Sequence, residues 1–143
     1  MTDLFPDISV GDVYTPMAEA EILSFEAVAA ITKGDPVYLT ADLKVSPATS
    51  AQNCIGIALK TVAAGELCPV CVEGVVKVTA GGAIALGQAV YGADASKRVL
   101  ALGDQAVNEG GTATYTIYYS RRLGFALQAF AAAGDTGLIC VEK

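Results

Sequence analysis

The sequence contains no histidine and no tryptophan, and only 17% of its 143 residues are charged. A chain without histidine lacks the commonest general base, the usual base partner of a catalytic serine and the commonest metal ligand. Nine lysine and arginine residues against 15 aspartate and glutamate residues give a formal net charge of −6. Nucleic-acid binding depends mainly on cationic side chains that displace counterions from phosphate. The composition therefore argues against most hydrolase mechanisms and against nucleic acid as a partner.

Long hydrophobic runs are also absent. No apolar run reaches the roughly 18 residues that a membrane span requires, and Met1–Asp7 lacks the basic segment that opens a signal peptide. We therefore expect no membrane partner and a protein that is made in the cytoplasm. The four cysteines are then expected to be free thiols, because disulfides are rare in a reducing compartment. The length fits one compact domain or two small halves.

What the sequence does contain is an internal repeat. The segment Ile31–Tyr38 returns as Ile84–Tyr91 at a shift of 53 positions, and Ile55–Leu59 returns as Leu123–Leu127 at a shift of 68. The shift is 69 for two further pairs of segments, Ala63–Glu66 with Ala132–Asp135 and Cys71–Glu73 with Cys140–Glu142. The growth of the shift from 53 to 68 places about 15 additional residues in the second copy. We therefore predict two related units, at about residues 18–74 and 75–143.

Each unit consists of short apolar segments separated by turn residues. Val37–Thr40 and Leu43–Val45 flank a two-residue turn, which predicts a hairpin. Val90–Tyr91 and Arg98–Leu102 predict the same hairpin with a longer tip. Cys54–Leu59 predicts a further strand, in which a glycine and an alanine permit the close approach of a neighbouring backbone. The expected fold class is all-β, a compact β-sandwich or barrel built from two related strand units.

The residues before the first repeated motif allow two interpretations. Met17–Ile31 is rich in alanine, glutamate, leucine and isoleucine, which is typical of a helix. The repeat favours a strand instead, because Ile22–Ser24 and Val75–Lys77 stand at the same distance before the repeated glycines. Residues 1–17 have no counterpart in the second unit, and we predict that they form an extended N-terminal arm before a β domain at residues 18–143.

Six glycine-containing motifs follow one another in a fixed order along the chain. They are Gly34–Val37, Ile55–Leu59, Ala63–Glu66, Val72–Val75, Gly87–Tyr91, and Leu123–Ala126 with Ala133–Asp135. In this order they resemble a family of phage capsid decoration, or cement, proteins, over a span from about Ala18 to the C-terminus. The resemblance implies a structural virion protein that binds the outer surface of the assembled capsid and stabilises the shell without catalysis. It also implies synthesis in the host cytoplasm, the major capsid protein as partner, and a homo-oligomer, for which a trimer is favoured over a dimer.

Two groups of apolar and aromatic residues are the predicted contacts with the capsid or with a neighbouring subunit. The first group lies on the arm and consists of Leu4, Phe5, Ile8, Val10 and Tyr14. The second lies on the predicted strand at residues 112–119 and consists of Tyr115, Ile117, Tyr118 and Tyr119. Tyrosine is enriched at protein interfaces, although core packing explains the second group equally well. The arm could also add to the sheet of a neighbour through its main chain.

Other functional classes remain as alternatives. The segment Cys68–Cys71 has the C-x-x-C spacing of redox proteins and zinc sites. Its repeat counterpart has Gly137 in place of the first cysteine, and Cys54 and Cys140 form no second pair, so buried thiols are favoured. Lys44 lies in a hairpin, as does the modified lysine of a biotinyl-like or lipoyl-like carrier domain, but it lacks a symmetric methionine setting. We accordingly expect no catalytic residues, no cofactor and no metal site.

Overall fold

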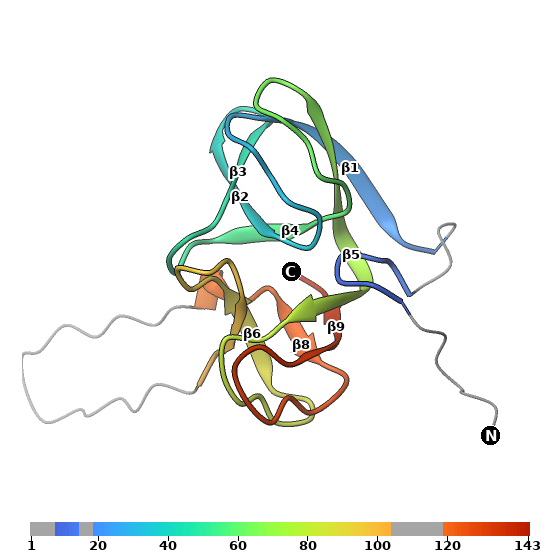
Figure 1. Cartoon of the computed structure of the whole chain (residues 1–143), viewed down its shortest axis with the longest axis vertical. Coiled ribbons are helices and arrows are strands. Elements are labelled where there is room, and N and C mark those ends of the chain that lie inside the picture. Colours follow the sequence, from blue (N-terminus) through green and yellow to red (C-terminus); the bar gives the residue numbers. More distant parts are fainter. Residues whose placement is uncertain (1–7, 15–18, 104–118) are drawn as a thin grey trace, which may run out of the picture.

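A computed structural model describes residues 8–14, 19–103 and 119–143. This part of the chain forms short strands and one turn of 3-10 helix, and Figure 1 shows them in two lobes stacked along the long axis of the molecule. In chain order the elements are β1 (Glu21–Ala27), β2 (Pro36–Ala41), β3 (Lys44–Pro47), β4 (Cys54–Ala58), β5 (Leu67–Thr79), β6 (Ala89–Gly92), β7 (Val99–Ala101), η1 (Tyr119–Arg121), β8 (Gly124–Ala126) and β9 (Thr136–Val141).

The first lobe, called barrel 1 below, is a closed ring of five strands. The strand β1 pairs in parallel with β3, β3 with β2, β2 with β4, and β4 with the first half of β5, the last three pairs being antiparallel. The first half of β5 then pairs with β1, which closes the ring. Because β-branched and small residues dominate these strands, their inward side chains can fill so narrow a barrel.

The second lobe, called barrel 2, repeats this order of strands. The second half of β5 pairs with β9, β9 with β8, β8 with β6, and β6 with β7, all antiparallel. A parallel bridge between Ala80 and Val99 closes the ring. Barrel 1 has the corresponding parallel pair between Ala27 and Val45. The two barrels therefore share one topology, down to the pair of residues that closes each ring.

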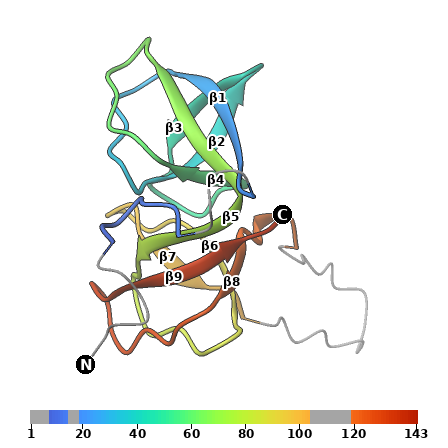
Figure 2. The same cartoon turned by 90° about the vertical axis from the view of Figure 1, so that its right-hand side faces the viewer.

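A single long strand joins the two barrels (Figure 2). Residues Leu67–Glu73 of β5 pair with β1 and form the last strand of the first unit, whereas Gly74–Thr79 pair with β9 and form the first strand of the second unit. Gly74, at the junction, has a φ of 143°, a value that favours glycine. The strand thus crosses the predicted boundary at residues 74 and 75 without a break.

The repeat extends to individual hydrogen bonds. In the turn before β2, Asp35 N donates to Thr32 O (3.0 Å) and Asp35 Oδ2 accepts from Thr32 N (2.9 Å). In the turn before β6, Gln88 N donates to Ala85 O (3.2 Å) and Gln88 Oε1 accepts from Ala85 N (3.1 Å). The third residue of each turn is a glycine with positive φ. Two different side chains therefore stabilise the same turn through an equivalent oxygen atom.

Each barrel has an apolar core, and the second core continues into the junction between the lobes. Barrel 1 is filled by Phe25, Ala27, Ile31, Val37, Val45, Ala58, Val62, Cys68 and Val70. Barrel 2 is filled by Val76, Val78, Ala80, Ile84, Val90, Val99, Leu123, Ala126, Phe130, Ile139 and Val141. The same cluster includes four residues of the first unit, Ala48, Cys54, Ile57 and Cys71. The two barrels are consequently joined by buried apolar surface as well as by β5.

The predicted fold class is confirmed: the described residues form an all-β structure of two related units, as barrels rather than a sandwich. The ambiguous segment around Ile22–Ser24 is the strand β1, as the repeat indicated, and not a helix. Both predicted hairpins are present, as β2–β3 and β6–β7. Within residues 8–14, 19–103 and 119–143, no helix has the length and apolar character to cross a bilayer. The division of the chain at residues 17 and 18 stays a prediction.

Candidate interaction surfaces

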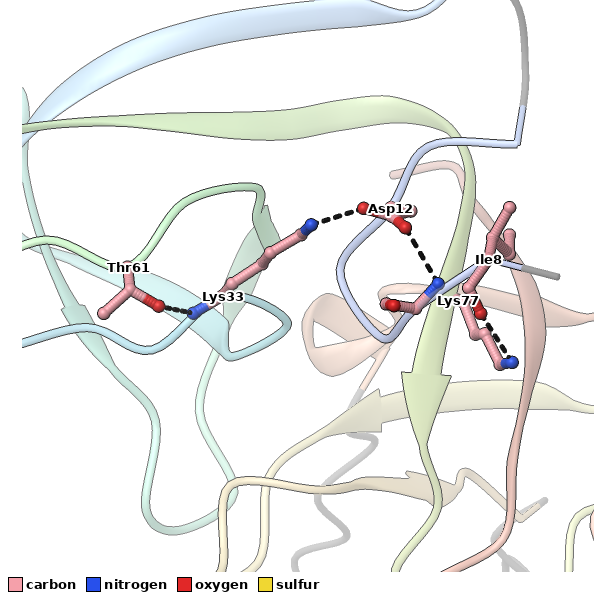
Figure 3. Close-up of polar contacts among 6 residues, drawn as sticks. Ile8, Asp12, Lys33, Thr61 and Lys77 are labelled. Atoms are coloured by element: carbon pink, nitrogen blue, oxygen red, sulfur yellow. Dashed lines mark hydrogen bonds and ion pairs between the residues drawn. The ribbon is translucent and has the colours of Figure 1, made fainter.

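Residues 8–14 lie along the second half of β5 and extend its sheet (Figure 3). Val13 forms an antiparallel bridge with Val76. Gly11 N donates to Lys77 O at 2.8 Å, and Lys77 N donates in return to a carbonyl of the segment at 3.1 Å. The main chain of residues 8–14, which could in principle have joined the sheet of a neighbour, thus makes these hydrogen bonds within its own chain.

Side chains fasten this segment to both barrels. From barrel 2, Lys77 Nζ donates to Ile8 O at 2.7 Å. From barrel 1, the ammonium group of Lys33 forms an ion pair with Asp12, while Lys33 N donates to Thr61 Oγ1 at 3.0 Å (Figure 3). The hydrogen bond from Lys33 lowers the pKa of Asp12. The segment therefore acts as a strap across the junction of the two barrels.

Two further polar contacts cross this junction. Asp35 of barrel 1 is 7% exposed, and its Oδ2 lies 3.7 Å from Lys97 Nζ in the β6–β7 hairpin. Burial raises the pKa of Asp35, the opposite of the effect on Asp12. Lys143 Nζ donates to Cys54 O in β4 at 2.9 Å, and burial lowers the pKa of this lysine. Polar contacts thus reinforce the apolar junction between the lobes.

One end of barrel 1, called mouth 1 below, is open and apolar. It is lined by inward-facing side chains of four strands, Leu23, Leu39, Ile55 and Val72. Leu23 is 46% exposed and Leu39 is 47% exposed. Together with neighbouring residues they enclose a hollow of about 480 Å³. Three exposed carboxylates surround it, those of Glu21, Glu73 and Glu142, and the side chain of Lys143 also lines it, so that acidic groups outnumber basic ones at the rim. An apolar floor with an acidic rim is typical of a protein contact surface.

The tip of the β2–β3 hairpin continues this apolar surface. Leu43 is 73% exposed and has a φ of 59°, in the left-handed region that disfavours bulky residues. It lines a shallow surface together with Leu39. The equivalent residue of barrel 2 is Lys97, with a φ of 62°. The two hairpins have the same tip conformation, but only the first presents an apolar side chain there.

The cysteines lie in surroundings that suppress thiol chemistry. Cys68 points into barrel 1, whereas Cys71, three positions further along the same strand, belongs to the cluster at the junction. Two side chains on opposite faces of a strand cannot act as a C-x-x-C pair. Burial raises the pKa of Cys54 to about 12 and that of Cys71 to about 11. In the part of the chain that the structure describes, all four cysteines are free and no group of three or more metal-ligating side chains comes together.

The predicted contact residues are placed only in part. Ile8 and Val10 are half-buried in the strap, and Tyr14 is 37% exposed. Tyr119 is the first residue of η1. The remaining predicted contacts lie outside the described residues and stay predictions: Leu4, Phe5, Tyr115, Ile117 and Tyr118. Lys44, the candidate for carrier modification, is the first residue of β3, and its Nζ lies 3.9 Å from a Glu26 carboxylate oxygen.

Two stacked barrels with packed cores and an exposed apolar mouth define an all-β protein with a candidate contact surface. The model of the phage cement protein family matches residues 48–141, which are 94 of the 143 residues, and the chain belongs to this family. The predicted resemblance is thereby confirmed. No curated protein matches the sequence significantly.

A solved structure has a similar fold. It is the N base of the head fiber protein gp8.5 of bacteriophage phi29, with a TM-score of 0.54 and 16% sequence identity. The similarity covers 86% of this chain and 94% of that chain. At this identity the similarity concerns the fold, and it includes both barrels, since neither alone could cover so much of the chain.

Sequence reasoning missed mouth 1. Its residues belong to strands that were predicted, but their alternation does not distinguish a side chain inside a barrel from one at its open end. A usable signal was the comparison of the two units, in which Leu39 stands where the second unit has Gly92. Gly92 lies at the end of barrel 2 that barrel 1 covers. A large apolar residue at the equivalent position of barrel 1 indicates that the corresponding end of barrel 1 has a different environment.

Proposed function

We propose that this protein is a cement protein of a phage virion that binds the outer surface of the assembled capsid and stabilises the shell. Binding to the assembled lattice in preference to its dissociated subunits moves the assembly equilibrium toward the intact shell by mass action. Such a role requires apolar contact area and a rigid scaffold rather than a reactive group. The match of the phage cement protein family over residues 48–141 is the observation that carries this proposal.

The physical properties of the chain support a structural role. Buried polar side-chain atoms of the described residues all have hydrogen-bond partners within the protein. The thiols have raised pKa values, which disfavours the reactive thiolate. Membership of a structural phage family points in the same direction, so we propose a protein without enzymatic activity.

The proposed partners are the major capsid protein and further copies of this chain. In this proposal the protein is made in the host cytoplasm, joins the capsid surface and acts as a homo-oligomer, with a trimer favoured over a dimer. The partly exposed leucines of mouth 1 and of the hairpin tip supply apolar area for such contacts. The aromatic and apolar residues of the arm are the proposed contacts with the shell.

The test is to mix the purified protein with undecorated heads of the same phage and to image the particles by cryo-electron microscopy. We expect regular surface density at one type of lattice position, and we expect decorated heads to withstand higher temperatures than undecorated ones. Folded protein that leaves the head surface bare at saturating concentration would refute the proposal.

A pair of variants tests the proposed arm contacts in the same assay. The double substitution Leu4→Asp and Phe5→Asp introduces two charges into the proposed contact and should lower binding by at least tenfold, since unpaired charges are costly to bury. Leu86→Asp is the matched control, because Leu86 is 70% exposed on barrel 2 and lies outside the proposed contacts. Equal binding of both variants to the heads would show that the arm does not contribute to the contact with the capsid.

A further inference from the structure

Within the chain, the mouth of barrel 2 is covered by the outer surface of barrel 1. Val76, Leu123 and Val141 line the mouth of barrel 2 at the positions equivalent to Leu23, Ile55 and Val72 of mouth 1, and each is 0% exposed. They belong to one buried cluster with residues on the outside of barrel 1.

The surface that seals this mouth is the outer side of β2, β4 and β5 in barrel 1, called wall 1 below. Its residues are Tyr38, Cys54, Ile57, Leu59 and Cys71. Contact is close, since a Cβ added to Gly92 at the mouth would lie 2.9 Å from Cys54 Sγ. Backbone hydrogen bonds support it: Gln52 N donates to Gly92 O and Ala93 N donates to Ser50 O, both at 3.0 Å.

Barrel 2 carries the same kind of surface on its own outer side, called wall 2 below. When the repeat shifts of 53, 68 and 69 are added to the residue numbers of wall 1, the equivalent residues of wall 2 are Tyr91, Arg122, Phe125, Leu127 and Cys140. In the part of the chain that the structure describes, wall 2 faces no further barrel: Leu127 is 41% exposed and the other four residues are partly exposed. Among the described residues, mouth 1 and wall 2 are therefore uncovered, and each is related by the repeat to a surface that is buried in the contact between the two barrels.

We propose that mouth 1 of one copy of this protein binds wall 2 of a second copy, in the manner in which the mouth of barrel 2 binds wall 1 within the chain. The occupant of mouth 1 is thus a second copy of this chain. This inference deepens the proposed function, because it assigns the surfaces through which the proposed oligomer forms.

The chemistry of the two surfaces agrees with this pairing. The aromatic and aliphatic residues of wall 2 match the apolar floor formed by Leu23 and Leu39. Wall 2 also carries Arg122 at the position of the uncharged Cys54, while the rim of mouth 1 carries Glu21 at the position of Gly74. Lys143 also lines mouth 1, but with three glutamates there the rim stays net negative, so the two surfaces differ in the sign of the charge that each carries, a pattern that favours correct pairing between copies.

Since the two surfaces differ, the contact is heterologous, and each copy uses both of them. Such contacts close into a ring when the rotation between copies permits it, and otherwise extend as a filament. The inference therefore predicts that a copy with one damaged surface still binds through the other.

This property defines the test, which uses the full chain without capsids. The variant Leu23→Asp damages mouth 1, and the variant Leu127→Asp damages wall 2. Sedimentation velocity measures the size of each variant alone and of their 1:1 mixture. We expect an oligomer for the unchanged protein and for the control Leu86→Asp. Each damaged variant should be monomeric, with self-association weakened on the order of 100-fold by the unpaired buried charge. The mixture should form a dimer, through the intact wall of the first variant and the intact mouth of the second.

Three results would overturn the inference: a monomeric unchanged protein, an undiminished oligomer in either damaged variant, or a mixture that stays monomeric. Circular dichroism confirms that the variants are folded, and Leu39→Asp replaces Leu23→Asp if the latter unfolds. The capsid assay gives an independent readout. If the protein self-associates through these surfaces but does not bind phage heads, the proposed function is refuted and the inferred interface is still supported.

Discussion

Two glycines illustrate how closely the strands of each barrel approach. Gly56 in β4 and Gly124 in β8 hold equivalent positions, 68 residues apart in the sequence. A Cβ added to Gly56 would overlap the carbonyl oxygen of Cys71, and one added to Gly124 would overlap that of Cys140. The two cysteines are also related by the repeat, so the same close backbone contact is built twice. Because the obstacle is main chain and not a movable side chain, no rotamer change can relieve it.

We therefore predict that Gly56→Ala and Gly124→Ala each lower the free energy of unfolding by about 2 kcal/mol or more, the cost of overpacking a tight site. Urea unfolding followed by circular dichroism measures the change. Gly82→Ala is the control, because a Cβ at Gly82 meets no atom within 4 Å and should alter stability by no more than about 0.5 kcal/mol. Alanine variants at positions 56 and 124 that match this control would contradict the packing described.

At the scale of elements, β5 and the strap that lies along it hold the two barrels in place. Residues 8–14 pair with the half of β5 that belongs to barrel 2, and Lys33 reaches them from barrel 1. Asp12 forms an ion pair with this lysine and has a pKa below its ordinary value of 3.8. A carboxylate whose pKa is lowered by folding contributes stability above its unfolded pKa, and the contribution is lost as the pH falls through the folded pKa.

Replacement of Asp12 by asparagine should therefore matter at neutral pH and cease to matter in acid. Since the two side chains are 39% and 35% exposed, solvent screens the ion pair, and we expect a loss of about 0.5 kcal/mol at pH 7. Hydrogen exchange at the Lys77 amide, which donates to Asp12 O, should accelerate. The loss should disappear below the folded pKa of Asp12, where the carboxylate of the unchanged protein is itself protonated.

Thermal unfolding between pH 7 and pH 2 measures this difference, with Asp42→Asn in the exposed hairpin turn as the control. A difference between Asp12→Asn and the unchanged protein that does not shrink as the pH falls would show that the strap is held by something other than this ion pair.

At the scale of the whole molecule, the two barrels share a strand and a buried cluster. The cluster that fills barrel 2 includes Cys54, Ile57 and Cys71 of the first unit. Separation of the lobes would expose this apolar surface and the backbone groups of the junction. Neither unit can therefore unfold without loss of contacts that the other unit requires.

We predict one cooperative unfolding transition, which core changes in either barrel shift alike. Val37 and Val90 are equivalent, both 0% exposed, and each alanine variant should lower the free energy of unfolding by about 2 kcal/mol. Tyrosine fluorescence and far-ultraviolet circular dichroism should give coincident curves for both variants. Two separate transitions, or a change confined to one of them, would show that the barrels unfold independently.

Much of this architecture could be predicted, because it depends on order along the chain. The repeat correctly identified β1 as a strand, since equivalent segments adopt equivalent structures even where helix propensity is high. Strand and turn residues located the hairpin β2–β3, and the repeat located its counterpart β6–β7. Mouth 1 could not be predicted from the alternation of apolar residues, because Leu23 and Leu39 alternate like the core residues beside them. Their exposure depends on where the barrel ends and on what covers that end.

The sequence by itself determined the all-β fold class and the duplication, since these follow from the spacing of apolar residues and turns, and its ordered motifs indicated the family by resemblance. It also removed histidine-based chemistry from consideration. The tertiary structure alone decided that Cys68 and Cys71 lie on opposite faces of a strand, that residues 8–14 pair with their own chain, and that one mouth is sealed while its equivalent is open. These features depend on contacts between residues far apart in the chain, and two copies of one local pattern can differ in them completely.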